Sequence, residues 1–559
     1  MSDIRVQRRD GEIRVSSFRQ VHHVAVLKRL DPADFRIITF RPTFLDPPTL
    51  APRALARALV LATTISTPIM SHPTPPSADS EDPLARLERE FNLTPVQLST
   101  IATRFVNEMR KGLDRHGATL PMIPTYVTSS VTGHERGSYM ALDMGGTNLR
   151  VCRVDLEGAG RVSVEQETFV IPAELKLAPI VDLFDWVVSC VELFFTHKGH
   201  PLPLVDPETE AAQQDSLYVG FTFSFSVNQT ALNRGTLLAW SKGFHCPGLL
   251  GTGADIVELL QESFRRRRHR IVVTALVNDT AGTLLACGYQ DPTCKVGVIL
   301  GTGTNAAYYE TRSALRKWGT LPHEDPRSSF TEMIINTEWA EFDDERDVVP
   351  VTRYDCELDV ATNDVGTSIF EKLISGLYLG EVVRLALADL HSHKLVFPRL
   401  ADGADQPFRT AQKTLAEPYR FTSEYVSLIV ADTSSDLAAV AQVLADFLGV
   451  PTAGISHTDC VVVRTVCSLV GTRAARLSAV GVAAIFTRRP ELLEKEEGST
   501  VAVDGSLFEK YPGWVAIMEE TLRGLLGEER TRRIRLRLVK DGSGIGAAIV
   551  AMLAAQQQK

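Results

Sequence analysis

The sequence predicts an α/β protein of two lobes, built from a duplicated unit and separated by a cleft. Two observations lead to this prediction. Segments 138–171 and 295–311 each begin as a strand, a turn rich in glycine and threonine, and a second strand, and the turns lie about 155 residues apart. Between them a buried strand, 273–277, ends at Asn278 and Asp279. Polar residues at the carboxyl end of a strand point into the crevice where open α/β sheets bind ligands.

The composition is that of an ordinary globular protein. The chain has 559 residues, 44% of them hydrophobic and 23% charged, which suits two to four domains. A net charge of -9 gives no indication of a nucleic-acid or membrane-surface protein. The 8 cysteines are scattered without a CxxC pair, so they indicate buried reduced thiols, not a disulfide framework or a zinc site. The basic run 265–270 is typical of a solvated helix end, more than of an anion-binding patch.

The first 81 residues differ from the rest. Their hydrophobic periodicity is poor, and the segment TPIMSHPTPPSADSEDP has the composition of a disordered linker. The apolar run 58–65 is too short for a transmembrane helix and too far in for a signal peptide. We expect 1–81 to be a disordered extension and linker, with Met70 as an alternative natural start. Acidic residues argue against an organelle presequence, so we expect a cytoplasmic protein.

Ordered structure is predicted from residue 82. Thr94 and Gln97 form a capping box around Pro95, and the helix that follows has one apolar face and stops near Gly112. We assign this core helix to the first lobe, 82–275. The second lobe would span 276–555, with 541–555 packing back at the junction of the lobes.

The first glycine turn has the features of an anion site. Its residues are Asp143, Gly145, Gly146, Thr147 and Asn148, followed by Arg150. Two glycines let the backbone approach a ligand and turn N–H groups toward an anion. Asp143 can hold the water shell of a Mg²⁺ ion. A plain hairpin turn explains the sequence equally well, and no GxxxxGK[ST] loop occurs.

The strand 217–223 is followed by many hydrogen-bonding side chains: Ser224, Ser226, Asn228, Gln229, Thr230, Asn233, Ser241 and Lys242. A buried polyol needs such neighbours, because each of its hydroxyls must be paired with a hydrogen-bond donor and a hydrogen-bond acceptor. Lys242 can face a phosphoryl group, although taken alone it is more typical of a surface lysine.

Asp279 is the candidate base. Its carboxylate can accept a proton from a substrate hydroxyl, and Asn278 can orient that substrate, although Asp279 and Thr280 can also simply cap the helix that follows. A second turn rich in glycine and threonine resembles the one at 143–148 and contains Gly301, Thr302, Gly303, Thr304 and Asn305. Two such turns could hold a nucleotide's phosphates from both lobes.

Two further carboxylates and a final glycine turn complete the candidates. Glu338 follows a strand-like stretch, 333–336, and Glu371 lies in a predicted helix. Either can accept from polyol hydroxyls, and either can be an ordinary salt-bridged glutamate. Residues 461–486 predict a buried helix pair. Segment 536–553 predicts a strand, a turn and a helix whose start can lie against a nucleotide, or a plain connection.

The motifs LDMGGTNLR, GFTFSF, WSKGF, VNDTAGTL, GTGTN, NTEW, FEKLISG-YLGE, DGS-YPG and KDGSGIGAA occur here in one order over about 82–555. In that order they resemble the eukaryotic hexokinases. The residues within the motifs look more like those of a fungal glucokinase than those of a generalist hexokinase. The resemblance implies an actin-like, ribonuclease H-like fold whose two lobes close on a hexose and MgATP. It implies phosphorylation of the 6-hydroxyl of the hexose, glucose above all, with no nucleic-acid partner. Monomer and homodimer both stay open.

The resemblance also implies roles for individual residues. Asp279 would be the base, with Lys242 beside the phosphoryl group. The residues that would hold the sugar are Ser224, Ser241, Lys242, Asn278, Asn305, Glu338 and Glu371. Those that would hold MgATP are Asp143, Gly145 to Asn148, Arg150, Gly301 to Thr304, Ser423, Gly542, Ser543 and Gly544.

Some positions depart from the hexokinase pattern. Ser226 replaces a proline, Ser241 a threonine, and Ala340-Glu341 a glycine and a small residue, while 364–368 reads DVGTS in place of an Asn-Pro-Gly-Gln-Gln type of segment. These positions surround the implied sugar pocket, so they bear on sugar choice. A non-catalytic glucose sensor and an actin- or chaperone-like ATPase are the alternative functions, and the polyol cluster argues against the second.

Overall fold

The computed structural model describes residues 4–9, 12–17, 25–27, 82–204, 216–240, 243–318, 330–401 and 406–557. The chain divides into two compact units, Met1–Ala78 and Asp79–Lys559. In the first unit, β1 (Ile4–Arg9), β2 (Glu12–Ser17) and β3 (Ala25–Leu27) form an antiparallel sheet. The prediction of disorder is wrong for these strands, because apolar and polar residues alternate in them and Asp10-Gly11 separates the first two. Met70 and the predicted linker lie outside the described residues.

The second unit contains a five-stranded sheet of order β11-β8-β5-β6-β7. Its strands are β5 (Arg136–Met144), β6 (Asn148–Gly158), β7 (Arg161–Val170), β8 (Leu217–Phe223) and β11 (Ile271–Val277). β5, β6 and β7 are antiparallel neighbours, whereas β8 and β11 run parallel to β5. Helices α4 (Ile180–Lys198) and α5 (Ile256–Arg266) bury their apolar sides in one core with this sheet. A separate hairpin, β9 (Ser226–Ala231) and β10 (Arg234–Ala239), follows β8.

A second sheet repeats the same topology. Its order is β16-β15-β12-β13-β14-β4. The strands are β4 (Ile123–Pro124), β12 (Cys294–Leu300), β13 (Thr304–Thr311), β14 (Glu332–Asn336), β15 (Ser499–Asp504) and β16 (Ile534–Leu538). Numbered along the chain, the strands of each sheet follow the order 5-4-1-2-3, with β4 added at one edge of the second. The first three strands are antiparallel and the last two are parallel to the first. This repetition confirms the predicted duplication.

The second sheet carries most of the helices. They are α2 (Pro83–Phe91), α3 (Pro95–Asp114), α7 (Arg353–Ala361), α8 (Ile369–Ile374), α9 (Gly376–Ser392), α10 (Pro398–Ala401), α11 (Gln406–Ala416), α12 (Ser423–Ala431), α13 (Ala438–Leu448), α14 (His457–Arg488), α15 (Ser506–Lys510), α16 (Trp514–Leu526) and α17 (Glu528–Thr531). Short 3₁₀ turns lie at Ala173–Lys176, Arg312–Ala314, Arg316–Trp318, Trp339–Glu341, Thr452–Gly454 and Pro490–Leu493.

The long helix α14 corrects one prediction. Residues 461–486 belong to a single helix of 32 residues, not to a helix pair, since the helix contains no proline and continues through Gly471 and Gly481. Among the described residues, α14 alone is long and apolar enough to cross a membrane, and 83% of its apolar window is buried inside the protein. That burial is what the central helix of a large core shows.

The N-terminal helices also correct a prediction. The capping box at Thr94 is present as expected. However, α2 and α3 pack in the core of the second sheet, not with the first lobe to which 82–275 was assigned. The Phe105 ring lies 4.3 Å from that of Phe342 and 5.6 Å from that of Phe370, centroid to centroid. An apolar helix face predicts burial but does not reveal which core it enters.

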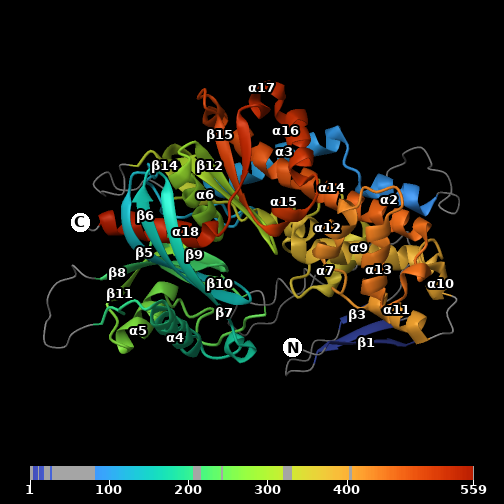
Figure 1. Ribbon diagram of the computed structural model, residues 1–559, viewed down its shortest axis with the longest axis horizontal. Helices are drawn as coiled ribbons and strands as arrows, with labels where there is room; N and C mark the ends of the chain where they lie inside the picture. Colours follow the sequence, from blue (N-terminus) through green and yellow to red (C-terminus); the bar gives the residue numbers. More distant parts are fainter. Residues whose placement is uncertain are drawn as a thin grey trace. The chain divides into compact units, whose positions relative to one another are not determined.

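Two helices lie between the sheets. α6 (Asp279–Gln290) and α18 (Gly542–Gln557) share a core with residues of β5, β6 and β11 on one side and of β13 and β14 on the other. Figure 1 shows α18, the last helix of the chain, among the strands of the first sheet. The two helices touch at glycines, because a Cβ on Gly546 would lie 2.0 Å from the carbonyl oxygen of Gly282. This close contact fixes the starts of both helices, which carry the candidate site.

Candidate functional site

The two glycine turns occupy equivalent places in the two sheets. The first joins β5 to β6, and the Gly145 N–H donates to the carbonyl of Asn148 at 3.0 Å. The second joins β12 to β13, and the Gly301 N–H donates to the carbonyl of Gly303 at 3.0 Å. Thr147 and Thr302 are exposed at the turns. Both turns therefore present backbone and hydroxyl groups to a ligand, as phosphate binding requires.

Asp143 lies at the end of β5 and is buried. Its Oδ2 accepts a hydrogen bond of 2.7 Å from the Ser543 hydroxyl and lies 3.7 Å from Nη2 of Arg150. Nη1 of Arg150 pairs with Asp541 at 2.9 Å. The start of α18 is thereby attached to the first glycine turn. Gly542, Ser543 and Gly544 are buried, so the Ser543 side chain braces Asp143 and does not face open space.

Asp504 also belongs to the site, although it was not predicted as a site residue from the sequence. It ends β15, and its Oδ2 accepts the Gly542 N–H at 3.2 Å. Burial raises the pKa of Asp504 to about 6, against the opposing effects of the Gly542 N–H and Arg150, and the charges of Asp541 and Asp279 add to the rise. A signal was available, because Asp504, like Asp143, comes directly at the end of an apolar strand and near a glycine. The 541–543 turn is thus bonded to an aspartate from each sheet.

Asn278 and Asp279 lie where β11 gives way to α6. Asn278 is the N-cap, and its side chain accepts the Thr280 N–H at 2.9 Å. Asp279 is the first residue of the helix, and its Oδ1 also accepts the Thr280 N–H, at 2.8 Å. Both side chains are half-buried. The N-cap is thus Asn278, not Asp279 or Thr280 as the capping alternative had it, and the positive end of the helix dipole favours a carboxylate at Asp279.

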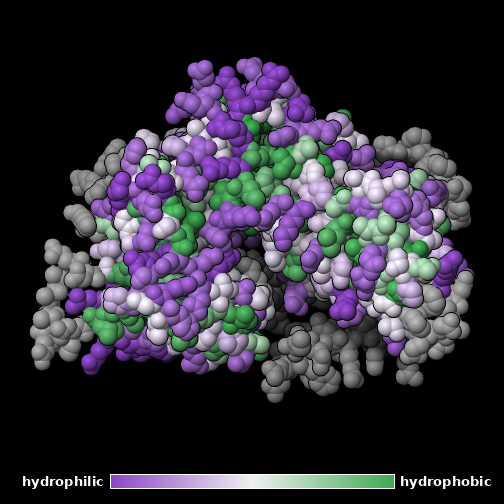
Figure 2. Space-filling model, in the orientation of Figure 1, coloured by the Kyte–Doolittle hydropathy of each residue, from purple (hydrophilic) through white to green (hydrophobic). Residues whose placement is uncertain are grey.

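A small pocket adjoins Asn278. Its volume is about 20 Å³, room for about one water, so a hexose can enter only if its walls move. The lining residues are Ile123, Thr125, Phe223, Phe225, Val227, Gln229, Leu276, Val277, Asn278, Asn336 and Glu338. They come from both sheets and from the β9 hairpin. The face drawn in Figure 2 is covered mainly by polar residues, with apolar residues gathered in separate patches.

Asn336 was missed as a site residue and connects two that were predicted. Its amide donates to Oε1 of Glu338 at 2.5 Å, and its Oδ1 accepts from the Asn305 amide at 2.8 Å. Glu338 has a left-handed backbone, with φ of 50°, which is costly for a side chain of this size. Asn336 is the last residue of β14. It could have been predicted in the same way as Asp279, as a polar residue at the carboxyl end of an apolar strand. The structure brings Asn278, Asn336 and Glu338 to one pocket.

Glu371 does not line that pocket. Its Oε2 accepts the Thr304 N–H at 3.0 Å, at the end of the second glycine turn. The Thr304 side chain is buried, and its Oγ1 accepts from the indole of Trp339 at 3.0 Å, so only the backbone of Thr304 faces the turn. The Gly376 N–H at the start of α9 donates to the Gly301 carbonyl at 2.8 Å. Ser423, at the start of α12, lies near Gly376 and thus close to this turn.

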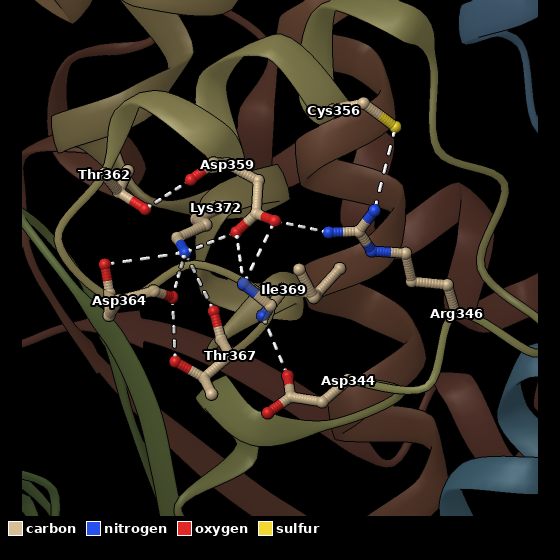
Figure 3. A network of polar contacts seen from close by, with 10 residues as sticks. Asp344, Arg346, Cys356, Asp359, Thr362, Asp364, Thr367, Ile369 and Lys372 are labelled. Atoms are coloured by element: carbon tan, nitrogen blue, oxygen red, sulfur yellow. Dashed lines mark hydrogen bonds and ion pairs between the residues drawn. The ribbon is translucent and has the colours of Figure 1, made fainter. Parts of the chain in front are cut away.

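The loop 364–368, which departs from the hexokinase pattern, is held by a buried lysine. Lys372 donates to the carboxylate of Asp359 at 2.7 Å and to the carbonyls of Asp364 and Thr367, both at 2.9 Å. Figure 3 shows these contacts, with Arg346 on the other side of Asp359. Lys372 follows Glu371 directly in α8, so the loop is anchored beside the helix that carries Glu371.

Glu341 is a second departure from the pattern and lies near Glu338. Burial raises the pKa of Glu341 to about 7, and the charges of Glu338 and Asp344 add to the rise. Burial likewise raises the pKa of Asp344 to about 7, although its contacts with the Ile369 and Ser368 backbone oppose this. The carboxylates of Glu341 and Asp344 therefore change charge near neutral pH.

The remaining predicted residues are less informative. Ser224 is half-buried after β8, and its N–H donates to the Met144 carbonyl at 3.2 Å, which places it beside the first glycine turn. Ser241 and Lys242 lie outside the described residues. Within the described ranges no group of three or more His, Cys, Asp or Glu side chains forms a metal site.

Comparisons with known proteins agree with this arrangement. Two hexokinase family models match residues 83–289 and 295–553. The chain is 36% identical to a glucokinase of Aspergillus niger, over 85% of this chain and 98% of that protein. It is 39% identical to Hexokinase-1 of Spinacia oleracea, over 82% and 88% of the two chains. The solved hexokinase of Schistosoma mansoni complexed with glucose matches with a TM-score of 0.72 and 33% identity, over 84% of this chain and 98% of that one.

The family models together cover most of the chain, and the relatives are matched over nearly their whole length. These matches span the two duplicated sheets, the two glycine turns, and Asp279, which follows the end of β11 between the turns in the sequence. The fold class predicted from the sequence is confirmed by the solved structures. The chain belongs to the hexokinase family.

Proposed function

We propose that this protein transfers the terminal phosphoryl group of ATP to the 6-hydroxyl of a hexose, with glucose as the preferred sugar. The observation that carries the proposal is the position of Asp279. Its carboxylate lies at the start of α6, next to Asn278 on the wall of the pocket, and close enough to Asp504 for its charge to affect that group's pKa.

In this mechanism the protein supplies position and charge more than covalent chemistry. Asp279 accepts the proton of the 6-hydroxyl as the sugar oxygen forms its bond to the terminal phosphorus and the bond to the bridging oxygen of ADP breaks. Asn278, Asn336 and Glu338 orient the sugar, since amides and carboxylates pair with its hydroxyls. The N–H groups of the two glycine turns hold the phosphates. A positioned base contributes about 10² to 10⁴-fold to the rate.

Mg²⁺ fits this site as a partner of the nucleotide. Mg²⁺ commonly keeps several waters and binds through one or two carboxylates and the substrate phosphates. The Asp143 and Asp504 carboxylates both lie against the 541–543 turn, one from each sheet, and would hold such a water shell. When bound, the ion neutralises charge on the phosphates. Arg150, paired with Asp541 at 2.9 Å, adds a fixed positive charge beside them.

The small pocket implies movement during the reaction. At about 20 Å³ it does not accommodate a hexose, so the walls contributed by the β9 hairpin and by β14 must shift when the sugar binds. Closure around the sugar would also keep water from replacing it as the phosphoryl acceptor. The 8 free cysteines suit a reducing compartment, and we infer a cytoplasmic enzyme acting in glucose use and glucose homeostasis.

A turnover panel tests the proposal. ADP release would be measured with glucose, fructose, mannose and N-acetylglucosamine in the presence of ATP and Mg²⁺. We expect sugar-dependent turnover, highest kcat/KM with glucose, and no turnover after Mg²⁺ is removed with a chelator. Glucose binding without turnover would favour a sensor, and turnover without any sugar would favour an ATPase; either result would contradict the proposal.

A further inference from the structure

A second cavity lies between the end of α2 and one face of α14. Its volume is about 220 Å³, which makes it roomier than the pocket beside Asn278. The lining residues are Phe91, Asn92, Arg464, Thr465, Ser468, Leu469, Thr472 and Arg476. None of them belongs to the site described above, and the proposed phosphoryl transfer gives them no role.

The cavity is built by a regular polar stripe. Residues 464, 468, 472 and 476 recur every four positions along α14, so their side chains lie on one face of the helix. Thr465 and Leu469 flank this stripe, and the last turn of α2 closes one side through Phe91 and Asn92. The rest of α14 is largely buried in the core, so this stripe is the part of the helix left for solvent or a ligand.

The lining carries two arginines and no carboxylate, in a chain whose net charge is -9. The contrast with Arg473, on a neighbouring face of α14, is informative. Arg473 is fully buried, and its Nη1 and Nη2 pair with the two oxygens of Asp355 at 2.6 and 2.7 Å. Within the described part of the chain Arg464, unlike Arg473, makes no ion pair, while the buried Nε atoms of both residues have no hydrogen-bond partner. No carboxylate among the described residues therefore compensates the charge of Arg464.

Arg476 is fixed at the other end of the stripe. Its Nη1 donates to Oδ1 of Asn92 at 2.6 Å and to the Leu93 carbonyl at 3.3 Å. A guanidinium has five N–H donors, and these contacts engage only Nη1. Arg476 is thus oriented, but not neutralised, by the residues that the structure describes. Arg464 and Arg476 lie about 18 Å apart along the helix axis, measured between their backbones, with three hydroxyl side chains between them.

We propose that this cavity binds a small phosphorylated sugar, with Arg464 on a phosphate and Thr465, Ser468 and Thr472 on sugar hydroxyls. Arginine pairs with phosphate through two parallel N–H donors, and hydroxyl side chains match a polyol. A cation at each end of the stripe favours a ligand with two phosphates.

The test uses the full chain with its other site filled. Fructose 1,6-bisphosphate is titrated by calorimetry into protein saturated with glucose and a non-hydrolysable ATP analogue. We expect one binding site in the parent protein, and binding at least about tenfold weaker in Arg464→Gln because a charge-assisted contact is lost. Arg265→Gln, at an exposed arginine of α5, is the matched control and should bind as the parent does. Inorganic phosphate should bind more weakly than the bisphosphate, since it reaches one arginine only.

Two results would overturn the proposal: no binding of the bisphosphate to the parent protein, or equal affinity in the parent and Arg464→Gln. Because Arg464 makes no hydrogen bond through its Nε and no ion pair in the described chain, Arg464→Gln should keep the parent's melting temperature and its glucose turnover. Thr472→Val is a second variant that leaves the charge intact and should weaken binding a few-fold. Binding is read independently of turnover, so a failed kinase assignment would leave this result interpretable.

Discussion

The hydroxyl of Ser543 donates a 2.7 Å hydrogen bond to the carboxylate of Asp143, and both residues are buried. These residues lie 400 positions apart in the chain, and the bond attaches the last helix to the first glycine turn. The neighbouring Gly542 N–H donates to Asp504 from the second sheet. One short turn therefore sets the positions of two aspartates that come from different sheets.

Ser543→Ala tests this brace. We expect the KM for ATP to rise several-fold with little change in the KM for glucose, because Asp143 would lose the contact that orients its carboxylate beside the phosphate turn. The loss of one buried hydrogen bond should lower the free energy of unfolding by about 1 kcal/mol. Steady-state kinetics and denaturant unfolding measure the two effects. An equal rise in both KM values would indicate a general structural defect and no specific role for the brace.

Gly303→Ala tests the contact between Glu371 and the second turn. A Cβ on Gly303 would lie 2.7 Å from Oε2 of Glu371, so the carboxylate must move. Glu371 is among the residues that the resemblance to hexokinases implies for holding the sugar, so we expect glucose affinity, measured by fluorescence titration, to fall about tenfold, a loss of about 1.4 kcal/mol. Gly301→Ala is the control, because nothing lies nearer than 3.8 Å to a Cβ there. Equal glucose affinity in both variants would show that the position of Glu371 does not matter for the sugar.

Glu341→Gln should change the pH dependence of stability. The folded pKa of about 7 lies above the ordinary value of 4.5, so the folded state binds this proton more tightly than the unfolded state does. The stabilising contribution of Glu341 is thus fully present below pH 4.5 and is lost as the pH rises through 7. At pH 8 the variant should be more stable than the parent by about 1–2 kcal/mol, and at pH 4 the two should be alike. Glu519→Gln, at an exposed residue of α16, is the control.

This measurement consists of denaturant unfolding of the three proteins at several pH values between 4 and 8. A constant difference between Glu341→Gln and the parent across this range would contradict the raised pKa. Because Glu341 adjoins Glu338, we also expect the KM for glucose to depend less on pH between 6 and 8 in the variant.

Gly546→Ala tests the close approach of α6 and α18. The added Cβ would lie 2.0 Å from the Gly282 carbonyl, so the helices must separate, and we expect a loss of about 3 kcal/mol or more in the free energy of unfolding. Gly524→Ala places the same methyl group in the exposed helix α16, where no atom lies within 4 Å. That control should gain about 0.5–1 kcal/mol, because alanine favours a helix over glycine. Similar stability in the two variants would show that the helices do not depend on this contact.

Much of the site could be predicted because it follows one local rule. Asp143 and Asp279 are polar residues at or just after the end of apolar strands, and that pattern is visible without a structure. The same rule points to Asp504 and Asn336, which the sequence analysis passed over. The repeated glycine turns predicted the duplicated topology, since a turn between two strands is a local feature.

The remaining features depend on contacts between distant segments. Nothing local in α3 indicates that its Phe105 packs against Phe342 from the second lobe. The contact of Ser543 with Asp143 could not be predicted for the same reason, since the two residues lie 400 positions apart in the sequence. In the N-terminal unit, alternating residues around Asp10-Gly11 contained a strand signal that the charged composition obscured.

The most direct measurement of the central claim is glucose phosphorylation by Asp279→Asn, with glucose binding measured on the same protein. Asparagine keeps the shape of the side chain but cannot accept the proton of the 6-hydroxyl. We predict that kcat falls by about 10² to 10⁴-fold while the Kd for glucose stays within a few-fold of the parent. Turnover within a few-fold of the parent would contradict the assignment of Asp279 as the base.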